Sequence, residues 1–413
     1  MGKIAYITVK APYGRLGETY IFPEMLAIIE KGMELLILPR DRSEELFHRS
    51  AEPLVGNTLS VPLFSSAIAK DLLKVAFRSP LQLLALLRDT VFRSRNAEIA
   101  LKNIRIVPKA VHLSERLKSE NIDHIHAHYG STTSTMAYII SVLTGIPWSF
   151  TVHRWDIPEN NLLSLKCRNA VFVRAIDERG REEVIRIVNG AAPSEKIRNI
   201  HVGIHVNGTS RSSDAETGKP FTILCPAMLV LKKGHKYLFE ACRLLSERGR
   251  KFRCLIAGDG PLRDELGLMA ENSGLNGTVE LLGALTQEQM FGLYKSGSID
   301  LVVLPSIVTG DGEKEGIPVS LMEAMSYAIP VISTDTGGIP ELLGCGSGII
   351  VNEKDPVSLS SAIEKLMEDE AYCRLLGARG REKVEQEFNV SDIADRLLNL
   401  FSPNHNSQAN NFK

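Results

Sequence analysis

Residues 299–334 read IDLVVLPSIVTGDGEKEGIPVSLMEAMSYAIPVIST and hold a strand, a helix and a second strand in order. The apolar runs IDLVVLP and IPVIST predict buried strands. Between them, a polar glycine-rich loop leads into GIPVSLMEAM, whose apolar residues have helical spacing. Two strands joined by a helix predict a βαβ unit, in which the strands run parallel.

The same alternation extends outward in both directions. FTILCPA, FRCLIAG, VELLG and GIIV read as further strands of the second half. In the first half we expect strands near residues 4–9, 34–38, 124–126, 148–152, 170–173 and 197–200. A helix is expected from Glu18, and others across 66–118. The pattern predicts an α/β protein with two doubly wound, Rossmann-like parallel sheets that face each other across a cleft.

A polar stretch, NGTSRSSDAETGKP at 207–220, separates the halves and reads as a linker. The length of 413 residues fits two domains. We therefore expect a first domain at 1–206 and a second at 221–389. Residues 390–401, VSDIADRLLNLF, have apolar side chains at helical spacing beyond the last strand. This helix could pack back on either domain, the first included.

Composition bounds the class of protein. Hydrophobic residues make up 44% of the chain, which excludes disorder as the dominant state. Lys and Arg number 48 against 49 Asp and Glu, so no net charge draws the whole molecule to nucleic acid. The six cysteines lack C-x-x-C spacing and read as buried residues of a reducing compartment. No signal peptide or membrane span is recognised, so we expect a cytoplasmic protein.

The loop before the helix of the opening stretch is suited to binding a phosphate. Pro318 lies where the first turn of a helix is expected. The N–H groups of Gly316, Ile317 and Val319 then lack intrahelical partners and lie at the positive end of the helix dipole. We expect an anion to bind at this point.

Two carboxylates flank this predicted phosphate site. Glu315 precedes the helix and Glu323 lies within it, so their carboxylates are on the order of 10 Å apart. That separation suits two hydroxyl-bearing groups on either side of a diphosphate: a ribose diol at Glu323 and a sugar at Glu315. The alternative is that Glu315 is a solvated loop charge and Glu323 a helix-surface residue.

These elements resemble a known family. The E-x7-E element with GIPVSLMEAM, followed by GGIPELL, resembles the retaining nucleotide-sugar glycosyltransferases of glycosyltransferase family 4, which have the GT-B fold. AGDGPLRDEL from Ala257 is similar to that family's glycine turn near the donor, and VELLGAL from Val279 to the strand and loop that meet the base. HIHAHYGS and SFTVHRWDI of the first half are also similar. GETYIFPEM from Gly17 resembles the opening of members that build bacterial exopolysaccharide and lipopolysaccharide.

The resemblance implies transfer of a sugar from a nucleoside diphosphate to an acceptor hydroxyl, with retention of configuration and without a metal or other cofactor. The acceptor would be a glycan or a lipid-linked glycan. Glu315 would contact the donor sugar on its reacting side, and His153 would lie near the transferred sugar and the new bond. The implied donor-binding residues are Lys233 (diphosphate), Glu323 (ribose), Gly316, Ile317, Gly258, Gly260 and Leu285. The implied acceptor-side residues are Arg15, Gly17, Glu18 and Thr19.

One position departs from the family pattern. Met228 stands where the family usually has Arg, five residues before the matching Lys233. An Arg would bind the diphosphate bidentately and stabilise the departing charge. Lys232 or Arg15 could substitute for it. The departure also motivates an alternative function, a non-catalytic GT-B module that binds a sugar nucleotide or a glycan.

Other chemistries fit less well. His124, His126 and His128 share one face of a strand, but about 6 to 7 Å separates successive ligands there, so packing and hydrogen bonding are favoured over a metal site. A nicotinamide dehydrogenase lacks its G-x-G-x-x-G after a first strand. A glycoside hydrolase would need two carboxylates roughly 5 to 9.5 Å apart across one bond.

The region 60–120 is basic and amphipathic. It contains eleven Lys or Arg residues and five acids, interleaved with leucines and other apolar residues. One interpretation is a set of surface helices with solvated faces. The other is a basic patch, from Lys70 to Arg105, that rests on the anionic inner leaflet of a membrane where a lipid-linked acceptor would lie.

Overall fold

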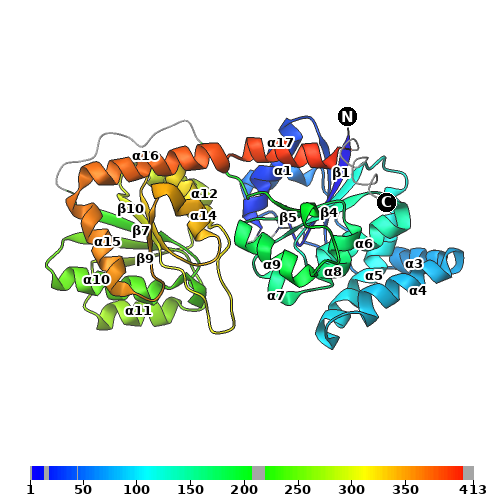
Figure 1. Ribbon diagram of the computed structural model, residues 1–413, viewed down its shortest axis with the longest axis horizontal. Coiled ribbons are helices and arrows are strands. Elements are labelled where there is room, and N and C mark those ends of the chain that lie inside the picture. Colours follow the sequence, from blue (N-terminus) through cyan, green and yellow to red (C-terminus); the bar gives the residue numbers. More distant parts are fainter. Residues whose placement is uncertain (1, 14–17, 44, 207–218, 403–413) are drawn as a thin grey trace. The chain divides into compact units, whose positions relative to one another are not determined.

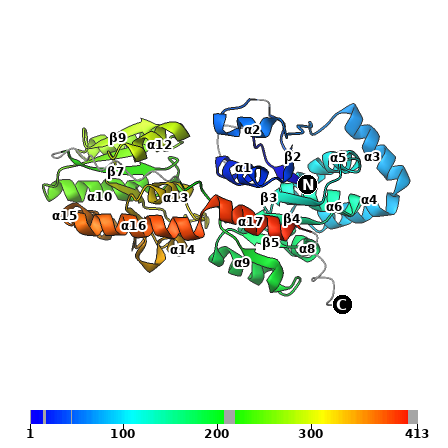
Figure 2. The same ribbon diagram turned by 90° about the horizontal axis from the view of Figure 1, so that it is seen from above.

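The structure is a computed structural model that describes residues 2–13, 18–43, 45–206 and 219–402. The chain divides into two compact units, shown in Figures 1 and 2. Unit 1 comprises Met1–Gly203 with Val390–Lys413, and unit 2 comprises Ile204–Asn389. Each unit contains one parallel sheet of six strands covered by helices. This architecture confirms the predicted α/β class with two doubly wound sheets.

The sheet of unit 1 has the order β2-β1-β3-β4-β5-β6. Its strands are β1 (Lys3–Thr8), β2 (Glu34–Pro39), β3 (His124–His128), β4 (Trp148–Val152), β5 (Val173–Ala175) and β6 (Ile197–Asn199). The helices are α1 (Phe22–Glu30), α2 (Glu52–Val55), α3 (Ser66–Arg78), α4 (Pro80–Leu87), α5 (Ala97–Leu117), α6 (Thr132–Thr144), α7 (Asp156–Glu159), α8 (Leu163–Asn169), α9 (Glu178–Val188) and α17 (Val390–Phe401). Short helical turns cover Thr19–Ile21, Arg49–Ala51, Arg88–Phe92 and Ser194–Lys196.

The sheet of unit 2 has the order β12-β11-β10-β7-β8-β9. Its strands are β7 (Phe221–Pro226), β8 (Phe252–Ala257), β9 (Val279–Gly283), β10 (Leu301–Leu304), β11 (Val331–Thr334) and β12 (Ile349–Val351). The helices are α10 (His235–Glu247), α11 (Arg263–Asn272), α12 (Gln287–Lys295), α13 (Val319–Ser326), α14 (Ile339–Leu343), α15 (Pro356–Glu368) and α16 (Glu370–Glu387). Short helical turns cover Leu231–Lys233 and Gly344–Gly346.

In each unit the strand order reverses at one point. The chain of unit 1 passes from β1 to β2 on one side and then to β3 on the other, and unit 2 does the same from β7 to β8 and later to β10. Loops that leave two neighbouring strands in opposite directions open a crevice at their carboxyl ends, where ligands bind in doubly wound sheets. The two reversal points, β1/β3 and β7/β10, are therefore the places to look for a site.

The last helix belongs to unit 1. Every large apolar residue of one face of α17 is buried, and the ring of Phe401 packs at a tilt against the rings of His124 and Phe172. The exposed side carries Asp395, whose carboxylate pairs with Lys31 at 2.7 Å. The amphipathic spacing that predicted this helix therefore reflects burial against the α1 side of the first sheet.

Two local expectations were wrong. The fifth strand begins at Val173 rather than near Ala170, because α8 continues to Asn169 and Ala170 is its C-cap. Cys345, in the short turn Gly344–Gly346, is exposed, and Cys373 of α16 is only half-buried; the other four cysteines are buried as expected. The helix expected near Glu18 is confirmed, because Glu18 is the N-cap of the helical turn Thr19–Ile21, which leads directly into α1 at Phe22.

Candidate active site

The charged pair of unit 2 lies at the β7/β10 reversal point. Lys233 follows β7 in the short helical turn before α10, and Glu315 ends the long loop after β10. Lys233 Nζ is 3.0 Å from Glu315 Oε1, and both side chains are largely buried. The contact is an ion pair without hydrogen-bond geometry, so Oε1 keeps a lone pair for an incoming donor group. Two of the predicted donor-site residues thus meet, 82 positions apart in the chain.

Tight backbone contacts hold this loop in place. A Cβ atom on Gly337, which has φ +54, would lie 1.8 Å from the carbonyl oxygen of Glu315. A Cβ on Gly258, directly after β8, would lie 1.9 Å from the carbonyl oxygen of Ala227. Any larger residue would therefore push apart the loops that carry the site. The predicted glycine turn at Gly258 and Gly260 acts through this packing against the loop after β7.

The start of α13 presents free backbone donors. Among the described residues, none accepts a hydrogen bond from the N–H groups of Gly316, Ile317 or Val319. Helix α13 begins at Val319, and Pro318 is its N-cap rather than part of its first turn. Pro318 carries no N–H, and its extended backbone leaves the first helical donors facing out of the helix. The N-terminus of α13 therefore has the electrostatic character of an anion site.

Glu323 lies within α13 among buried neighbours. Burial raises its pKa to about 7, while a hydrogen bond with Gln287 of α12 opposes that shift. Tyr294, from the same α12, is fully buried, and its hydroxyl makes no hydrogen bond with a described residue. Leu285 precedes α12 and packs against the core of unit 2. The carboxylate therefore faces a poorly solvated place in which a hydroxyl donor would be well bound.

Met228 is placed next to the glycine turn. Its side chain is 45% exposed, and its backbone N lies 3.4 Å from where a Cβ of Gly258 would be. The position is thus accessible at the carboxyl edge of the sheet, as a phosphate-binding residue would need. Lys232 is partly exposed in the following turn. Arg15, the other proposed substitute, lies outside the described residues.

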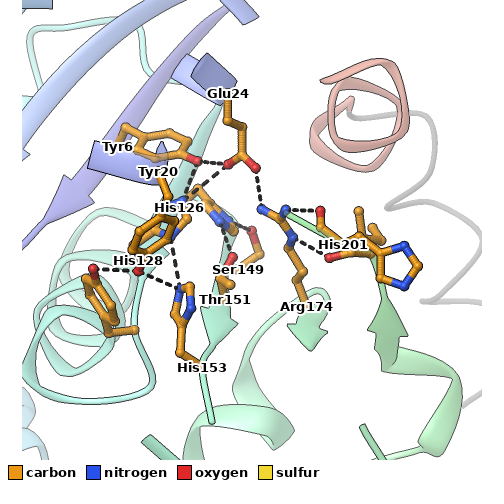
Figure 3. A network of polar contacts seen from close by, with 12 residues as sticks. Tyr6, Tyr20, Glu24, His126, His128, Ser149, Thr151, His153, Arg174 and His201 are labelled. Carbon is orange, nitrogen blue, oxygen red and sulfur yellow. Dashed lines mark hydrogen bonds and ion pairs between the residues drawn. The ribbon is translucent and has the colours of Figure 1, made fainter. Parts of the chain in front are cut away.

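The reversal point of unit 1 carries a buried histidine pair. His128 ends β3 and His153 directly follows β4, the neighbouring strand. His128 Nδ1 is 3.4 Å from His153 Nε2, and Tyr20 Oη is 3.5 Å from the same nitrogen (Figure 3). Burial holds the pKa of His153 well below its ordinary value. His153 is therefore a neutral imidazole with one N–H.

A network that the sequence did not indicate continues behind His128 (Figure 3). His128 Nε2 lies 2.8 Å from Tyr6 Oη and 3.2 Å from Glu24 Oε1. The Tyr6 hydroxyl donates to Glu24, and Arg174 donates to the other carboxylate oxygen at 2.6 Å. These side chains come from β1, α1, β3 and β5, and all are buried. Glu24 and Arg174 are 150 positions apart, so no local pattern could have paired them.

The network behind His128 contains a charged carboxylate. Glu24 is ionised because the Arg174 guanidinium and His128 hold its pKa far below the ordinary value against the effect of burial. Since the Tyr6 proton is directed to Glu24, the nearby Nε2 of His128 is the donor to these two residues. The other ring nitrogen of His128 faces Nε2 of His153, and Nδ1 of His153 bonds to no described residue.

The loop after β1 is closed by Glu18. Its carboxylate accepts hydrogen bonds from the backbone N–H groups of Val9, Lys10 and Ala11, at 2.9, 2.5 and 2.7 Å. Glu18 is 8% exposed, so it shapes the loop from inside. Thr19 begins the short helical turn that follows. Arg15 and Gly17, the other acceptor-side residues that the sequence suggests, lie outside the described residues.

The alternating histidines of β3 make hydrogen bonds, as predicted. His124 and His126 share the hydroxyl of Ser149, and His126 also contacts Thr151, both on the neighbouring β4. Across the ranges 2–13, 18–43, 45–206 and 219–402, no group of three or more His, Cys, Asp or Glu side chains is placed to hold a metal ion. Nor does any helix in those ranges have the length and apolar character needed to cross a membrane.

Comparison with known proteins supports the reading of unit 2. Residues 207–383 match the family described as glycosyl transferases group 1. The chain is 28% identical over 410 residues to the putative colanic acid biosynthesis glycosyltransferase WcaL of Salmonella typhimurium, covering 96% of this chain and 99% of that one. It is 35% identical over 220 residues to the amylovoran biosynthesis glycosyltransferase AmsK of Erwinia amylovora, covering 51% and 54%.

Solved structures agree on the fold. The Anabaena Alr3699/HepE protein in complex with UDP superposes with a TM-score of 0.70 at 17% identity, covering 96% of this chain and 98% of that one. The lipopolysaccharide outer core galactosyltransferase WaaB superposes with a TM-score of 0.67 at 16% identity, covering 96% and 98%.

The fold and the paired sheets define a two-domain α/β protein of the GT-B class. The match to residues 207–383 then makes the assignment specific: this GT-B protein contains a glycosyl transferases group 1 domain and is a glycosyltransferase.

Proposed function

We propose that the protein transfers a sugar from a nucleoside-diphosphate sugar to an acceptor hydroxyl with retention of configuration, in the biosynthesis of an exopolysaccharide or a related glycolipid. The observation that carries the proposal is the Lys233–Glu315 pair beside the free N–H groups at the start of α13. A cation, a carboxylate and a helix N-terminus at one reversal point match the charges of a sugar diphosphate.

Each donor group has a partner in this arrangement. The diphosphate would lie at the N–H groups of Gly316 and Ile317 and near Lys233, which would stabilise the charge that develops as the sugar leaves. No metal is needed for that role, since the backbone dipole and the lysine supply positive potential. Glu315 Oε1 would accept from a sugar hydroxyl on the reacting side, and Glu323 from the ribose diol.

His153 supplies the corresponding group of unit 1. With Nε2 of His153 facing His128 and Tyr20, its Nδ1 would form a hydrogen bond with a hydroxyl of the transferred sugar. Glu24 and Arg174 would act indirectly, by fixing the orientation of His128. Of the acceptor-side residues, Glu18 would hold the loop after β1 in the shape that the acceptor meets.

The names of the relatives suggest the pathway. WcaL and AmsK are named for colanic acid and amylovoran biosynthesis, and WaaB for the lipopolysaccharide outer core. HepE has been solved with UDP and with UDP-glucose. A relative from Corynebacterium glutamicum is named as GDP-mannose-dependent. UDP-sugars and GDP-mannose are therefore the first donors to test.

The test is release of nucleoside diphosphate from a panel of sugar nucleotides that includes UDP-glucose and GDP-mannose, with and without oligosaccharide acceptors. We expect release from at least one donor, and a loss of turnover of about a hundredfold or more in Glu315→Gln if its interaction strengthens in the transition state. Glu313→Gln, an exposed acid of the same loop, is the matched control and should retain full turnover. Full turnover in Glu315→Gln would contradict the assignment.

The alternative is a GT-B module that binds a sugar nucleotide or a glycan without transferring the sugar. Met228 favours it, because no guanidinium stands at the position where the family usually has one. Tight nucleotide binding by calorimetry, together with no release of nucleoside diphosphate from any donor, would support this alternative. Transfer of radiolabelled sugar to any acceptor would exclude it.

A further inference from the structure

Helices α3 and α4 form a hairpin at the periphery of unit 1, outside the sheet (Figures 1 and 2). Ile68 and Val75 of α3 and Leu83 and Leu86 of α4 face the core. The two helices are joined at Ser79, and a turn of π-helix, Arg88–Phe92, continues α4 toward α5. The core therefore uses only one side of each helix.

The sides of α3 and α4 that face away from the core carry large apolar residues that are exposed to solvent. Phe77 is 86% exposed, Leu81 80% and Phe92 82%. Leu73 lies one turn before Phe77, and Leu84 lies one turn after Leu81, and both are also exposed. Scattered exposed leucines need no explanation, but four large apolar side chains on this hairpin, with Phe92 on the turn that follows it, are the kind of cluster that marks an interaction surface.

The hairpin and the segment that follows it are also cationic, although many of their charges are paired. Residues 66–105, which run from α3 into α5, contain eight Lys or Arg residues against three Asp or Glu, an excess of five. Lys74 and Arg78 both pair with Glu115, which lies outside this segment, so that cluster keeps a positive charge. Arg88 and Arg93 share Asp89 in the same way. Lys109, counted in the sequence as part of the basic region, is buried instead and donates to backbone oxygens.

We infer that this hairpin inserts its apolar side chains into the surface of an anionic phospholipid bilayer, with the surrounding lysines and arginines against the lipid phosphates. The sequence suggested an electrostatic contact from Lys70 to Arg105. The structure changes the basis of the contact: the exposed phenylalanines and leucines would provide most of the binding, and the cations would select an anionic surface.

The positive charge argues for a bilayer over a second copy of the chain. Two copies that met through this surface would bring the same positive charges together, which repel in the dry centre of an interface. A lipid surface offers phosphates to the cations and hydrocarbon to Phe77 and Leu81. The inference is independent of the donor chemistry of unit 2, so either can fail without the other.

The first experiment measures sedimentation with vesicles of phosphatidylcholine and phosphatidylglycerol. The double variant Phe77→Ser, Leu81→Ser should bind at least about a hundredfold more weakly, since each buried side chain contributes roughly a ten- to hundredfold factor. The control is Leu268→Ser, Val357→Ser, which removes two exposed apolar residues from helices of unit 2 and should bind as the parent does. Circular dichroism and release of nucleoside diphosphate establish that the variants remain folded.

The second experiment reports insertion directly. Tryptophan introduced by Phe77→Trp should be quenched by brominated lipids beyond the quenching of the parent, whose tryptophans are Trp148 and Trp155. Moderate salt should weaken the binding and leave a residual that the apolar residues maintain. The variant Lys70→Gln, Arg105→Gln should reduce the preference for anionic over neutral vesicles.

Four results would overturn the inference. They are no sedimentation of the parent with anionic vesicles, equal binding by the serine variant, an unquenched tryptophan at position 77, and complete loss of binding in moderate salt. Concentration-dependent dimers that the serine variant abolishes, without vesicle binding, would assign the surface to a second copy instead.

Discussion

Glu323 gives the most discriminating prediction for the donor site, because its charge should change near neutral pH. Burial in α13 raises its pKa to about 7. If the carboxylate accepts both hydrogens of a ribose diol, the ionised form binds the donor and the protonated form binds it weakly. Donor affinity should therefore rise as the pH rises through 7.

The size of the effect follows from the ionised fraction. A carboxyl group with a pKa of about 7 is about 9% ionised at pH 6 and about 91% at pH 8. Affinity should therefore increase about tenfold between these pH values, which is about 1.4 kcal/mol. Binding at pH 6 should also release close to one proton, because the donor selects the ionised form.

Calorimetry with a sugar nucleotide is the suitable assay, since its diphosphate is esterified at both ends and does not titrate between pH 6 and 8. Glu323→Gln removes the titrating group and keeps the size of the side chain. Its affinity should be low and independent of pH. Buffers of different ionisation enthalpy measure the released proton. A parent affinity that is flat from pH 6 to 8, or an equal slope in Glu323→Gln, would refute the ribose assignment.

The same pKa predicts an effect on stability. Because the folded-state pKa of Glu323 lies above the unfolded value of 4.5, its contribution is fully present below pH 4.5 and is lost as the pH rises through about 7. The loss amounts to at most about 3 kcal/mol at pH 8. Glu323→Gln should therefore unfold at a higher denaturant concentration than the parent at pH 8, and at a similar concentration near pH 4.5.

Two further variants test the other interpretations. Met228→Arg should tighten nucleoside diphosphate binding by about ten- to a hundredfold, the worth of one charge-assisted hydrogen bond; a folded variant that binds no better would indicate that another cation, with Lys232 the first to test, already occupies the place. Glu24→Gln leaves the Arg174 guanidinium buried without a carboxylate and should cost about 3 to 5 kcal/mol in denaturant unfolding. Asp395→Asn, which breaks the more exposed pair with Lys31, is its control at about 0 to 1 kcal/mol, and equal losses in the two would contradict the buried-pair argument.

The sequence alone determined the secondary structure and the class of fold, because both depend on local periodicity. Alternating apolar runs located all six strands of unit 2, and helical spacing located α17 at residues 390–401. The loop before α13 was also readable, since proline and glycine fix the local backbone and leave N–H groups without partners. The start of the fifth strand was mispredicted because the preceding helix, α8, extends to Asn169.

The tertiary structure decided which of these residues meet. The sequence placed Lys233 and Glu315 at one site by resemblance, but only the order of the strands brings β7 and β10 together and the two side chains to 3.0 Å. The Glu24–Arg174 pair had no signal at all, because it joins α1 to β5 across 150 positions. The sequence could not predict exposure either. Leu81 and Leu83 are two residues apart, and only the packing shows that Leu81 is exposed to solvent while Leu83 is buried in the core. Periodicity depends only on a residue's neighbours along the chain. Contact and burial depend also on elements that are distant in the sequence and are brought close by the fold.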